Sequence, residues 1–316
     1  MHSTNRQPSE DLMKDDILVS ICIPAFNASK YIAETLESVM FQTHNNWELI
    51  VVEDGSDDGT HKIVCDFKKE VSQHVLYIRN ARNLGLPATR NVGVSACKGG
   101  WIAFLDSDDL WHKDHLRDLI NTSLSSSDCD LIHSGVELFD SATGKVIAKR
   151  TPSWEAINEL PVSLFTNSYI IQPSSVMVSR RLYEVTGGFN EHFKYVEDLE
   201  MWFKCIKSGF KIGFTGKNTC LYRKHAEAMT THAIPLALGV AGVYDRFSDW
   251  DAIPKRIRIN FASAQWLAVA RITRKKDRNL AKESLLKSIS YRLTFKHVLY
   301  WILITITSPT PSIKEV

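Results

Sequence analysis

The sequence predicts an α/β fold in which an open, largely parallel sheet carries helices on both faces and a basic helical appendage follows it. Two observations lead to this prediction. From Ile17 onward, short apolar runs alternate with segments of helical period, which is the pattern of strands joined by crossover helices. Beyond about Pro235, the pattern becomes wholly helical and basic.

Four short apolar runs, each bounded by turn or polar residues, are expected to be buried strands. They are residues 17–24, 47–52, 75–78 and 101–105. Apolar residues recur at helical spacing from Ile32 to Met40, on a helix that Asn27 or Ser29 could cap. Residues 57–70 and 87–97 fill the next two gaps as helices, so this half resembles a nucleotide-binding open sheet.

The alternation loosens after residue 109. We expect a helix over 112–123, a β-hairpin from 131–139 and 146–149, and a strand over 174–179. A further helix follows Tyr195, ends at Gly209 and holds Glu197 and Asp198 in its first turn. The predicted units are a polar tail (1–16), a domain over 17–234 with halves 17–110 and 111–234, and the appendage over 235–316.

Composition limits the class of protein. The chain has 316 residues, of which 44% are hydrophobic and 23% charged, so disorder and collagen-like structure are excluded. The six cysteines are scattered without a C-x-x-C pair and are expected to be reduced and mostly buried. The polar start lacks the apolar core of a secretory signal, so the cytoplasm is the expected compartment.

The net charge of +2 is unevenly distributed. Residues 251–316 hold 13 Lys and Arg against 4 Asp and Glu, whereas residues 1–250 hold 25 against 32. Such a basic tail could meet nucleic acid, anionic lipid or another subunit, and charge alone does not choose among them. Apolar residues interleave with the basic ones over 255–308, which favours a helix lying on an anionic membrane; a lid or an oligomer contact is the alternative.

Polar residues follow three of the predicted strands, where open α/β sheets bind ligands. They are Pro24-Ala25-Phe26-Asn27, the acidic run from Glu53 to Thr60, and Asp106-Ser107-Asp108-Asp109. Clustered carboxylates repel one another unless a cation is present, and Mg²⁺ or Mn²⁺ takes such oxygen ligands together with phosphates. Each acidic segment taken alone could be only a turn or a helix cap. No G-x-G-x-x-G or complete P-loop competes.

These segments resemble the successive signatures of glycosyltransferase family 2, whose catalytic domain has the GT-A fold. The resemblance spans roughly residues 17–230. The matching segments, in order, are V-S-I-C-I-P-A-F-N (19–27), L-I-V-V-E-D-G-S-D-D-G-T (49–60), R-N-L-G (82–85), A-T-R-N-V-G (88–93), I-A-F-L-D-S-D-D (102–109), G-G-F (187–189), E-D (197–198) and Y-R-K-H (222–225). Single motifs are weak, but their order and spacing are specific.

The resemblance implies a role for each matching residue. Asp54 would face the base of a nucleotide. The opposite wall of that pocket would be formed by Pro24, Ala25, Phe26 and Asn27. Glu53 and Ser107 would lie in the same nucleotide-sugar site, with Asp106 near the ribose. Asp108 would hold the Mn²⁺ or Mg²⁺ ion that bridges the diphosphate, and His225 would approach the same ion. Arg90 would support the acidic site or form a structural ion pair. Asp198 would be the catalytic base, its first-turn position favouring the ionised form.

The implied activity is inverting transfer of one sugar from a nucleotide donor, with UDP favoured, to a glycan or lipid-linked acceptor. The sequence departs from the family at Glu53, often aspartate, and at Lys204, often arginine. It lacks the Q-x-x-R-W segment and multiple membrane helices of processive synthases. A sugar-1-phosphate nucleotidyltransferase is an alternative with a similar fold, but it would need a glycine-rich basic loop near Pro24, which this sequence does not have. Two readings stay open: a non-catalytic nucleotide-sugar-binding or scaffold protein, and nucleic-acid binding by the tail, although nucleic acid is not the expected partner.

Overall fold

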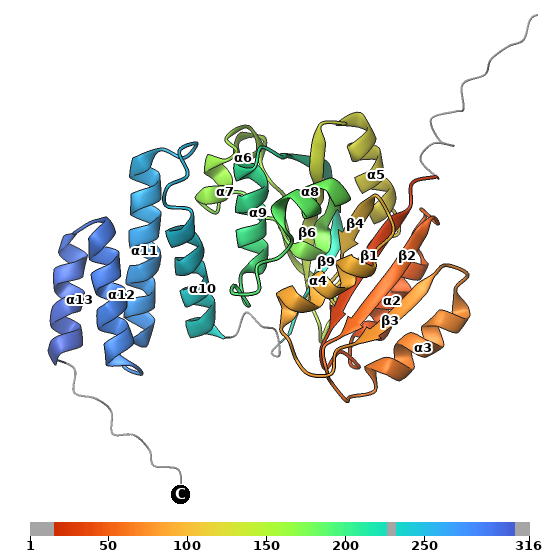
Figure 1. Cartoon of the computed structure of the whole chain (residues 1–316), viewed down its shortest axis with the longest axis horizontal. Coiled ribbons are helices and arrows are strands. Elements are labelled where there is room, and N and C mark those ends of the chain that lie inside the picture. The colour runs from red at the N-terminus through yellow and green to blue at the C-terminus, as the bar shows by residue number, and fades with distance from the viewer. Residues whose placement is uncertain (1–15, 226–231, 307–316) are drawn as a thin grey trace, which may run out of the picture.

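The computed structural model describes residues 16–225 and 232–306 (Figure 1). The predicted polar tail therefore lies outside the described residues, except for Asp16. A sheet with helices on both faces occupies one side of the molecule, and four helices from the C-terminal part of the chain occupy the other (Figure 1).

In the described part of the chain, nine strands form a single sheet in the order β3-β2-β1-β4-β8-β6-β9-β5, with β7 paired to β6. The four strands of the first half are parallel and match the prediction. The second half is mixed, because β8 runs antiparallel to β4 and β6, and β5 runs antiparallel to β9. The strands are β1 (Val19–Ala25), β2 (Trp47–Glu53), β3 (Val75–Arg79), β4 (Trp101–Phe104), β5 (Leu110–Trp111), β6 (Cys129–Asp140), β7 (Val146–Arg150), β8 (Val176–Ser179) and β9 (Lys211–Lys224).

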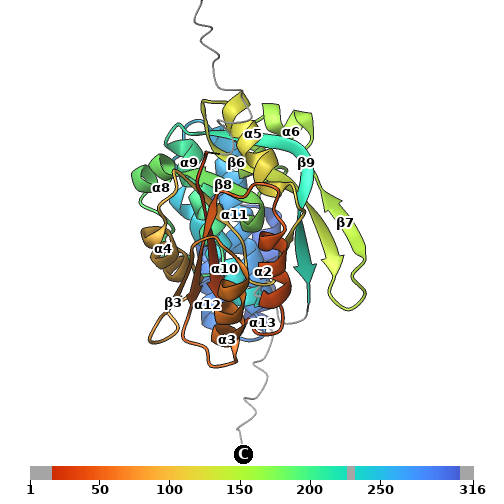
Figure 2. The same ribbon diagram turned by 90° about the vertical axis from the view of Figure 1, so that its right-hand side faces the viewer.

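The expected largely parallel sheet is thus correct only for the half that the βαβ pattern covers. A short apolar run such as that of β8 carries no signal for strand direction. Its predicted start was also wrong, because Pro173–Ser175 form a 3₁₀ turn before β8 begins at Val176. The predicted hairpin is present as β6 and β7, and β7 projects from the body of the sheet (Figure 2).

The helices of the first half lie on opposite faces of the sheet, as Figure 2 shows for α2 (Ile32–Met40) and α4 (Leu86–Ala96). Alternate strand residues explain this arrangement. Ile21 and Ile23 face one core with α2 and α3 (Thr60–Glu70), whereas Cys22 faces the other core with α4. The close approach of α4 requires Gly93, because a Cβ there would lie 2.4 Å from the Cys22 sulfur.

The predicted caps of α2 are wrong. Tyr31 occupies the N-cap position without a side-chain cap bond. Asn27 instead takes a left-handed conformation (φ 50°), and the backbone amide of Ser29 donates to Asp58 Oδ2 (2.8 Å). The Ser29 backbone therefore links the segment after β1 to the segment after β2 and does not cap the helix.

The second half adds helices α5 (His115–Ser125), α6 (Trp154–Asn158), α7 (Val162–Phe165), α8 (Arg180–Thr186) and α9 (Glu197–Lys207). The helix expected after Tyr195 is α9, and α5 begins three residues later than predicted. All six cysteines are free, and four are buried; Cys65 and Cys129 are partly exposed.

The C-terminal region consists of α10 (Ala233–Arg246), α11 (Lys255–Thr273), α12 (Arg278–Tyr291) and α13 (Phe295–Ile306). The first of these helices shares the core of the sheet domain: the Tyr244 ring meets Phe165 and Phe203 edge-on, and its hydroxyl donates to the Phe165 carbonyl (2.6 Å). The boundary at residue 234 stays a prediction. Among the described residues, no helix is both long and apolar enough to cross a membrane.

Candidate functional site

The exits of three parallel strands lie side by side at one edge of the sheet. β1 lies between β2 and β4, with Ala25 paired to Glu53 and Cys22 to Phe104. The backbone amide of Asp54 donates to the carbonyl oxygen of Ala25 (2.8 Å). The three polar segments that the sequence places after these strands therefore meet, as an open α/β sheet requires.

Asp54 anchors a neighbouring loop. Its carboxylate is 3% exposed. Oδ1 accepts bonds from the Leu84 amide and the Asn80 side chain, and Oδ2 accepts one from the Gly85 amide, each at 2.8 Å. The same loop crosses Gly55 (φ 77°) so closely that a Cβ there would lie 2.7 Å from the Arg82 backbone. Contact between Asp54 and a nucleotide base stays a prediction.

The end of β1 and the residues that follow it lie beside the exit of β2. Pro24 and Ala25 are buried, whereas Asn27 is exposed and the Phe26 side chain is 49% exposed. An aromatic ring with half its surface free can stack on a planar ligand. Glu53 faces inward instead, and its Oε1 accepts a bond from Ser56 Oγ (2.6 Å), so this carboxylate closes its own turn.

The segment after β4 is fixed by bonds from distant parts of the chain. The Asp106 amide donates to Ser174 Oγ (3.1 Å), and the Ser107 carbonyl accepts from Thr35 Oγ1 (3.0 Å). Asp108 Oδ2 lies 2.9 Å from His225 Nε2. The two predicted metal ligands, which are 117 residues apart in the sequence, are thus in contact.

The Asp108–His225 pair fits a divalent cation that is shared with a substrate. Mn²⁺ takes both oxygen and imidazole nitrogen ligands, and the Asp108 carboxylate is 34% exposed and open to a further partner. Across residues 16–225 and 232–306, no three His, Cys, Asp or Glu side chains form a ready-made metal site. Mg²⁺ and Mn²⁺ sites often have one or two carboxylates from the protein, with phosphate oxygens and water as the remaining ligands.

Arg90 joins two acidic segments. Its side chain on α4 is completely buried, and its guanidinium donates one bond to Glu197 and another to Asp106 Oδ1 (2.6 Å). The guanidinium also packs over the Phe189 ring, 5.3 Å from its centroid. Because a guanidinium stays charged, this arrangement couples the start of α9 to the exit of β4.

Asp198 is the second residue of α9 and is half-buried. Its Oδ1 accepts a bond from the Leu199 amide (2.8 Å). Burial raises the pKa of Asp198, and this effect outweighs the Leu199 amide and Arg90, which lower it. The helix start therefore favours the ionised form as expected, but burial outweighs it and the net shift of the pKa is upward. Burial also raises the pKa of Glu197, against the opposing effect of Arg90.

A buried network beneath the acidic segment escaped sequence reasoning. Asp109 is 1% exposed, and it accepts bonds from Ser174 Oγ (2.5 Å) and the Arg223 amide (2.9 Å). Burial and the neighbouring carboxylates raise the pKa of Asp109. The motif around Arg223 was recognised in the sequence. The sequence alone does not indicate that Arg223 or Ser174 bonds to Asp109.

Arg223 completes the support of the Asp108 segment. Its Nε donates to the Asp108 carbonyl (2.6 Å), and another guanidinium nitrogen lies 2.9 Å from Glu34. The guanidinium is sandwiched by the rings of Tyr31 and Phe139, each centroid 4.7 Å away. Such stacked and bonded arginines are rigid, so the backbone of Asp108 is held in place.

Trp111 and Trp154 differ in exposure. Trp111 is buried; its Nε1 donates to the Ser174 carbonyl (2.6 Å) and its ring stacks on His115, so it is part of the core. Trp154 is 76% exposed on α6.

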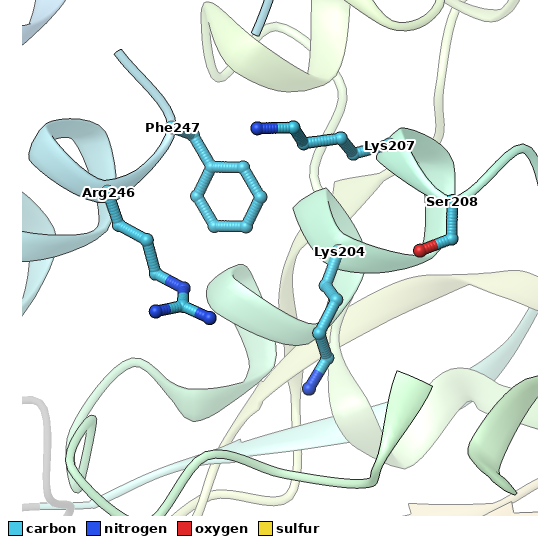
Figure 3. A pocket seen from close by; sticks show the side chains of 5 residues that line it. All are labelled: Lys204, Lys207, Ser208, Arg246 and Phe247. Atoms are coloured by element: carbon cyan, nitrogen blue, oxygen red, sulfur yellow. The ribbon is translucent and has the colours of Figure 1, made fainter. Parts of the chain in front are cut away.

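A cavity of about 330 Å³ lies at the other end of α9 from Asp198, lined by Lys204, Lys207, Ser208, Arg246 and Phe247 (Figure 3). Its cations already have partners. Lys204 donates to the Gly188 carbonyl (2.5 Å), Lys207 pairs with Asp249 (2.9 Å), and Arg246 lies 3.1 Å from the buried Glu200. We therefore assign no ligand to this cavity.

The comparison with known families decides the assignment of the chain. The model described as glycosyl transferase family 2 matches residues 20–184. The chain belongs to glycosyltransferase family 2. It is 31% identical over 256 residues to the putative teichuronic acid biosynthesis glycosyltransferase TuaG of Bacillus subtilis, covering 80% of this chain and 93% of TuaG. The Escherichia coli β-1,3-glucosyltransferase WfgD is 29% identical, with 61% and 71% covered.

Solved structures confirm the predicted GT-A fold. S. aureus TarS superposes with a TM-score of 0.65 at 17% identity, over 90% of this chain and 50% of TarS. The Pyrobaculum calidifontis mannosyltransferase PcManGT, solved with GDP-Man and Mn²⁺, gives a TM-score of 0.60 at 16% identity, over 90% of this chain and 78% of that protein. The family membership of the chain makes it a glycosyltransferase, as the motifs indicated.

Proposed function

We propose that this enzyme transfers a single sugar, with inversion, from a nucleotide donor to a glycan or lipid-linked acceptor in surface polysaccharide or glycoconjugate synthesis. The observation that carries the proposal is that Arg90 bonds both to Asp106, after β4, and to Glu197, the neighbour of Asp198, while Asp108 contacts His225. Intact carboxylates in this arrangement favour catalysis over a non-catalytic binding or scaffold role.

The donor is proposed to lie across the exits of β1, β2 and β4. Phe26 and Asn27 would form one wall of the base pocket, with the buried Pro24 and Ala25 beneath them. Asp54, Glu53 and the loop at residues 80–85 would form the other wall, while Ser107 and Asp106 would face the ribose. UDP is the favoured nucleotide. In support, TarS has been crystallised with UDP-GlcNAc, and the name of WfgD specifies UDP-Glc as donor.

The chemistry divides between two ends of the site. The acceptor hydroxyl must lose its proton as it attacks the anomeric carbon, and the nucleoside diphosphate must leave. Asp108 and His225 would hold a divalent ion, Mn²⁺ or Mg²⁺, which when bound neutralises the charge of the leaving diphosphate. The Asp106 amide donates to Ser174, and Arg223 donates to the Asp108 carbonyl. These bonds would keep both acidic residues beside the proposed ion.

Asp198 is proposed as the base that accepts the acceptor proton. Of the two neighbouring carboxylates, Glu197 bonds to Arg90, whereas Asp198 Oδ1 accepts a bond from the Leu199 backbone amide. The raised pKa of Asp198 strengthens it as a base, because proton transfer is most effective when the pKa of the base approaches the working pH. Arg90 positions this carboxylate indirectly, by fixing its neighbour.

The acceptor is proposed to be lipid-linked, which would bring the enzyme to the inner face of a membrane as a peripheral protein. The name of WfgD specifies a diphosphoundecaprenol-linked acceptor, and the basic C-terminal helices of this chain suit such a location. Nucleic-acid binding by the same helices is the competing reading. It predicts salt-sensitive binding of DNA or RNA that does not depend on Asp108.

Turnover with a panel of UDP-, GDP- and dTDP-sugars tests this function. The assay would contain Mn²⁺ and a GlcNAc-diphospholipid analogue, and it would measure release of the nucleoside diphosphate. We expect turnover of one donor, reduced about 10²- to 10⁴-fold in Asp198→Asn, with nucleotide binding retained. Glu184→Gln, an exposed carboxylate on α8, is the control and should match wild type. Donor binding without turnover would favour the scaffold reading.

A further inference from the structure

The last described helix, α13, has two opposite apolar faces. Its inner face carries His297, Tyr300 and Ile304; His297 and Ile304 are each 1% exposed, and Ile304 packs against Ala281 and Leu285. The outer face carries Phe295, Val298, Leu299 and Ile302, which are 84%, 48%, 48% and 45% exposed. Their spacing of i, i+3, i+4 and i+7 makes a continuous stripe along the helix. We call these four residues the outer stripe.

Polar contacts on the inner face fix the rotation of α13. The Thr294 amide donates to His297 Nδ1 (2.9 Å), so the ring proton resides on Nε2, which donates to Ser288 Oγ (2.7 Å). Ser288 Oγ in turn donates to the Ser263 carbonyl (2.6 Å). Turning α13 to bury the outer stripe would break this buried chain and leave its polar groups without partners, which is costly. The outer stripe is therefore apolar surface that the fold keeps outside.

Two basic residues lie near the N-terminal end of the stripe, Arg292 just before α13 and Lys296 within it. Arg292 and Lys296 are exposed on either side of Leu293, which is 66% exposed, and of Phe295. Residues 278–306 contain five Lys and Arg residues against Glu283 alone. Trp301 lies beside the stripe and is 40% exposed. An apolar helix face with a cationic border and a tryptophan at its margin is the arrangement that binds anionic lipid surfaces.

The position of α13 leaves it accessible. It is the outermost element of the described chain, at the end of the molecule opposite β3 (Figure 1). It has 12 residues, a length of about 18 Å, which is too short to cross a bilayer but long enough to lie along its surface.

We propose that the outer stripe of α13 docks on an anionic lipid surface, with Arg292 and Lys296 contacting the headgroups. The same charges argue against a second copy as the occupant, because a symmetric contact would bring two such cationic borders together. This inference gives a location to the peripheral position proposed above, but it does not depend on sugar transfer.

Vesicle flotation of the full chain tests the docking face. We expect binding to phosphatidylglycerol-containing vesicles and little binding to pure phosphatidylcholine. The triple variant Phe295→Ser/Leu299→Ser/Ile302→Ser should bind anionic vesicles at least about tenfold more weakly. Val185→Ser on α8, which removes an apolar side chain that is 64% exposed elsewhere, is the matched control and should bind as wild type does. Circular dichroism on each variant would show that the substitutions have not unfolded the domain.

The charge variant Arg292→Glu/Lys296→Glu separates electrostatic from apolar contributions. It should weaken binding to anionic vesicles by at least about tenfold and reduce its salt dependence. The proposal is overturned if wild type ignores anionic vesicles, or if the triple variant binds them as wild type does. It is also overturned if light scattering shows a dimer that the triple variant abolishes. UDP binding is measured on the same samples, which keeps the docking result apart from the enzyme assignment. Failure of the wild type to bind UDP would count against the donor site only.

Discussion

Replacing Arg90 with methionine is expected to lower the free energy of unfolding by about 3–5 kcal/mol, the usual cost of removing one partner from a buried ion pair. The two partners of Arg90 act on this cost in opposite directions: the buried Glu197 favours the upper part of the range, and the partly exposed Asp106 moderates it. Arg90 is fully buried and the Glu197 side chain is 4% exposed, so water cannot replace the lost partner of that carboxylate. The second partner, Asp106, is 25% exposed and can recover part of its hydration.

The matched control is Arg180→Met. Arg180 donates to the carbonyl oxygens of Cys97 (2.7 Å) and Gly99 (2.8 Å), so its removal leaves no buried charge. We expect a smaller loss, about 1–2 kcal/mol. The double variant Arg90→Met/Glu197→Met should be more stable than Arg90→Met alone, because it removes the orphaned carboxylate as well.

The assay is equilibrium unfolding in urea, with the free energy of unfolding compared at pH 8 and pH 6. Burial already raises the pKa of Glu197 in the wild type, and in Arg90→Met this pKa rises further because the lowering effect of Arg90 is lost, so the folded variant binds the proton more readily than the folded wild type does. The deficit should therefore shrink as the pH falls. The reasoning is refuted if Arg90→Met loses no more free energy of unfolding than Arg180→Met does. It is also refuted if the double variant is less stable than Arg90→Met by the full cost of a second substitution.

Two further predictions concern the pH profile and helix packing. The proposed base, Asp198, must be ionised to act, and burial raises its pKa. The acid limb of the kcat/KM profile should therefore have a pKa above the ordinary aspartate value of about 3.9, and Asp198→Asn should abolish that limb. A limb with a pKa at or below about 3.9 would contradict this prediction. Gly93→Ala should cost about 1–3 kcal/mol by thermal unfolding because its Cβ meets Cys22, whereas Gly100→Ala, with open space, should cost far less; equal losses would contradict the packing argument.

The half of the fold that the sequence predicted well is the half with local signals. The first four strands and the helices between them follow from apolar period and turn residues, and the crossover rule then places the exits of β1, β2 and β4 at one edge. The direction of β8 and its pairing with both β4 and β6 could not be read, because a strand of four residues is equally apolar in either direction.

The candidate site divides in the same way. Asp54, Asp106 and Asp108 were visible because each follows a strand, and Arg90, Asp198 and His225 were visible only through the family resemblance. The support from Ser174 and Arg223 to Asp109 joins residues 65 and 114 positions apart, a pairing that only the tertiary fold creates. The direction of the Asp198 pKa was also out of reach, since it depends on burial that a helix position does not reveal.

Calorimetric titration of UDP, with and without Mn²⁺, into wild type, Asp108→Asn and Asp198→Asn tests the central claim most directly. We predict metal-dependent UDP binding in wild type and in Asp198→Asn, and its loss in Asp108→Asn, because Asp108 is proposed to hold the ion and Asp198 to act on the acceptor. GDP and dTDP serve as comparison nucleotides. If none of the three binds to wild type with Mn²⁺ present, or if Asp108→Asn binds UDP as wild type does, the proposed metal-dependent donor site is wrong.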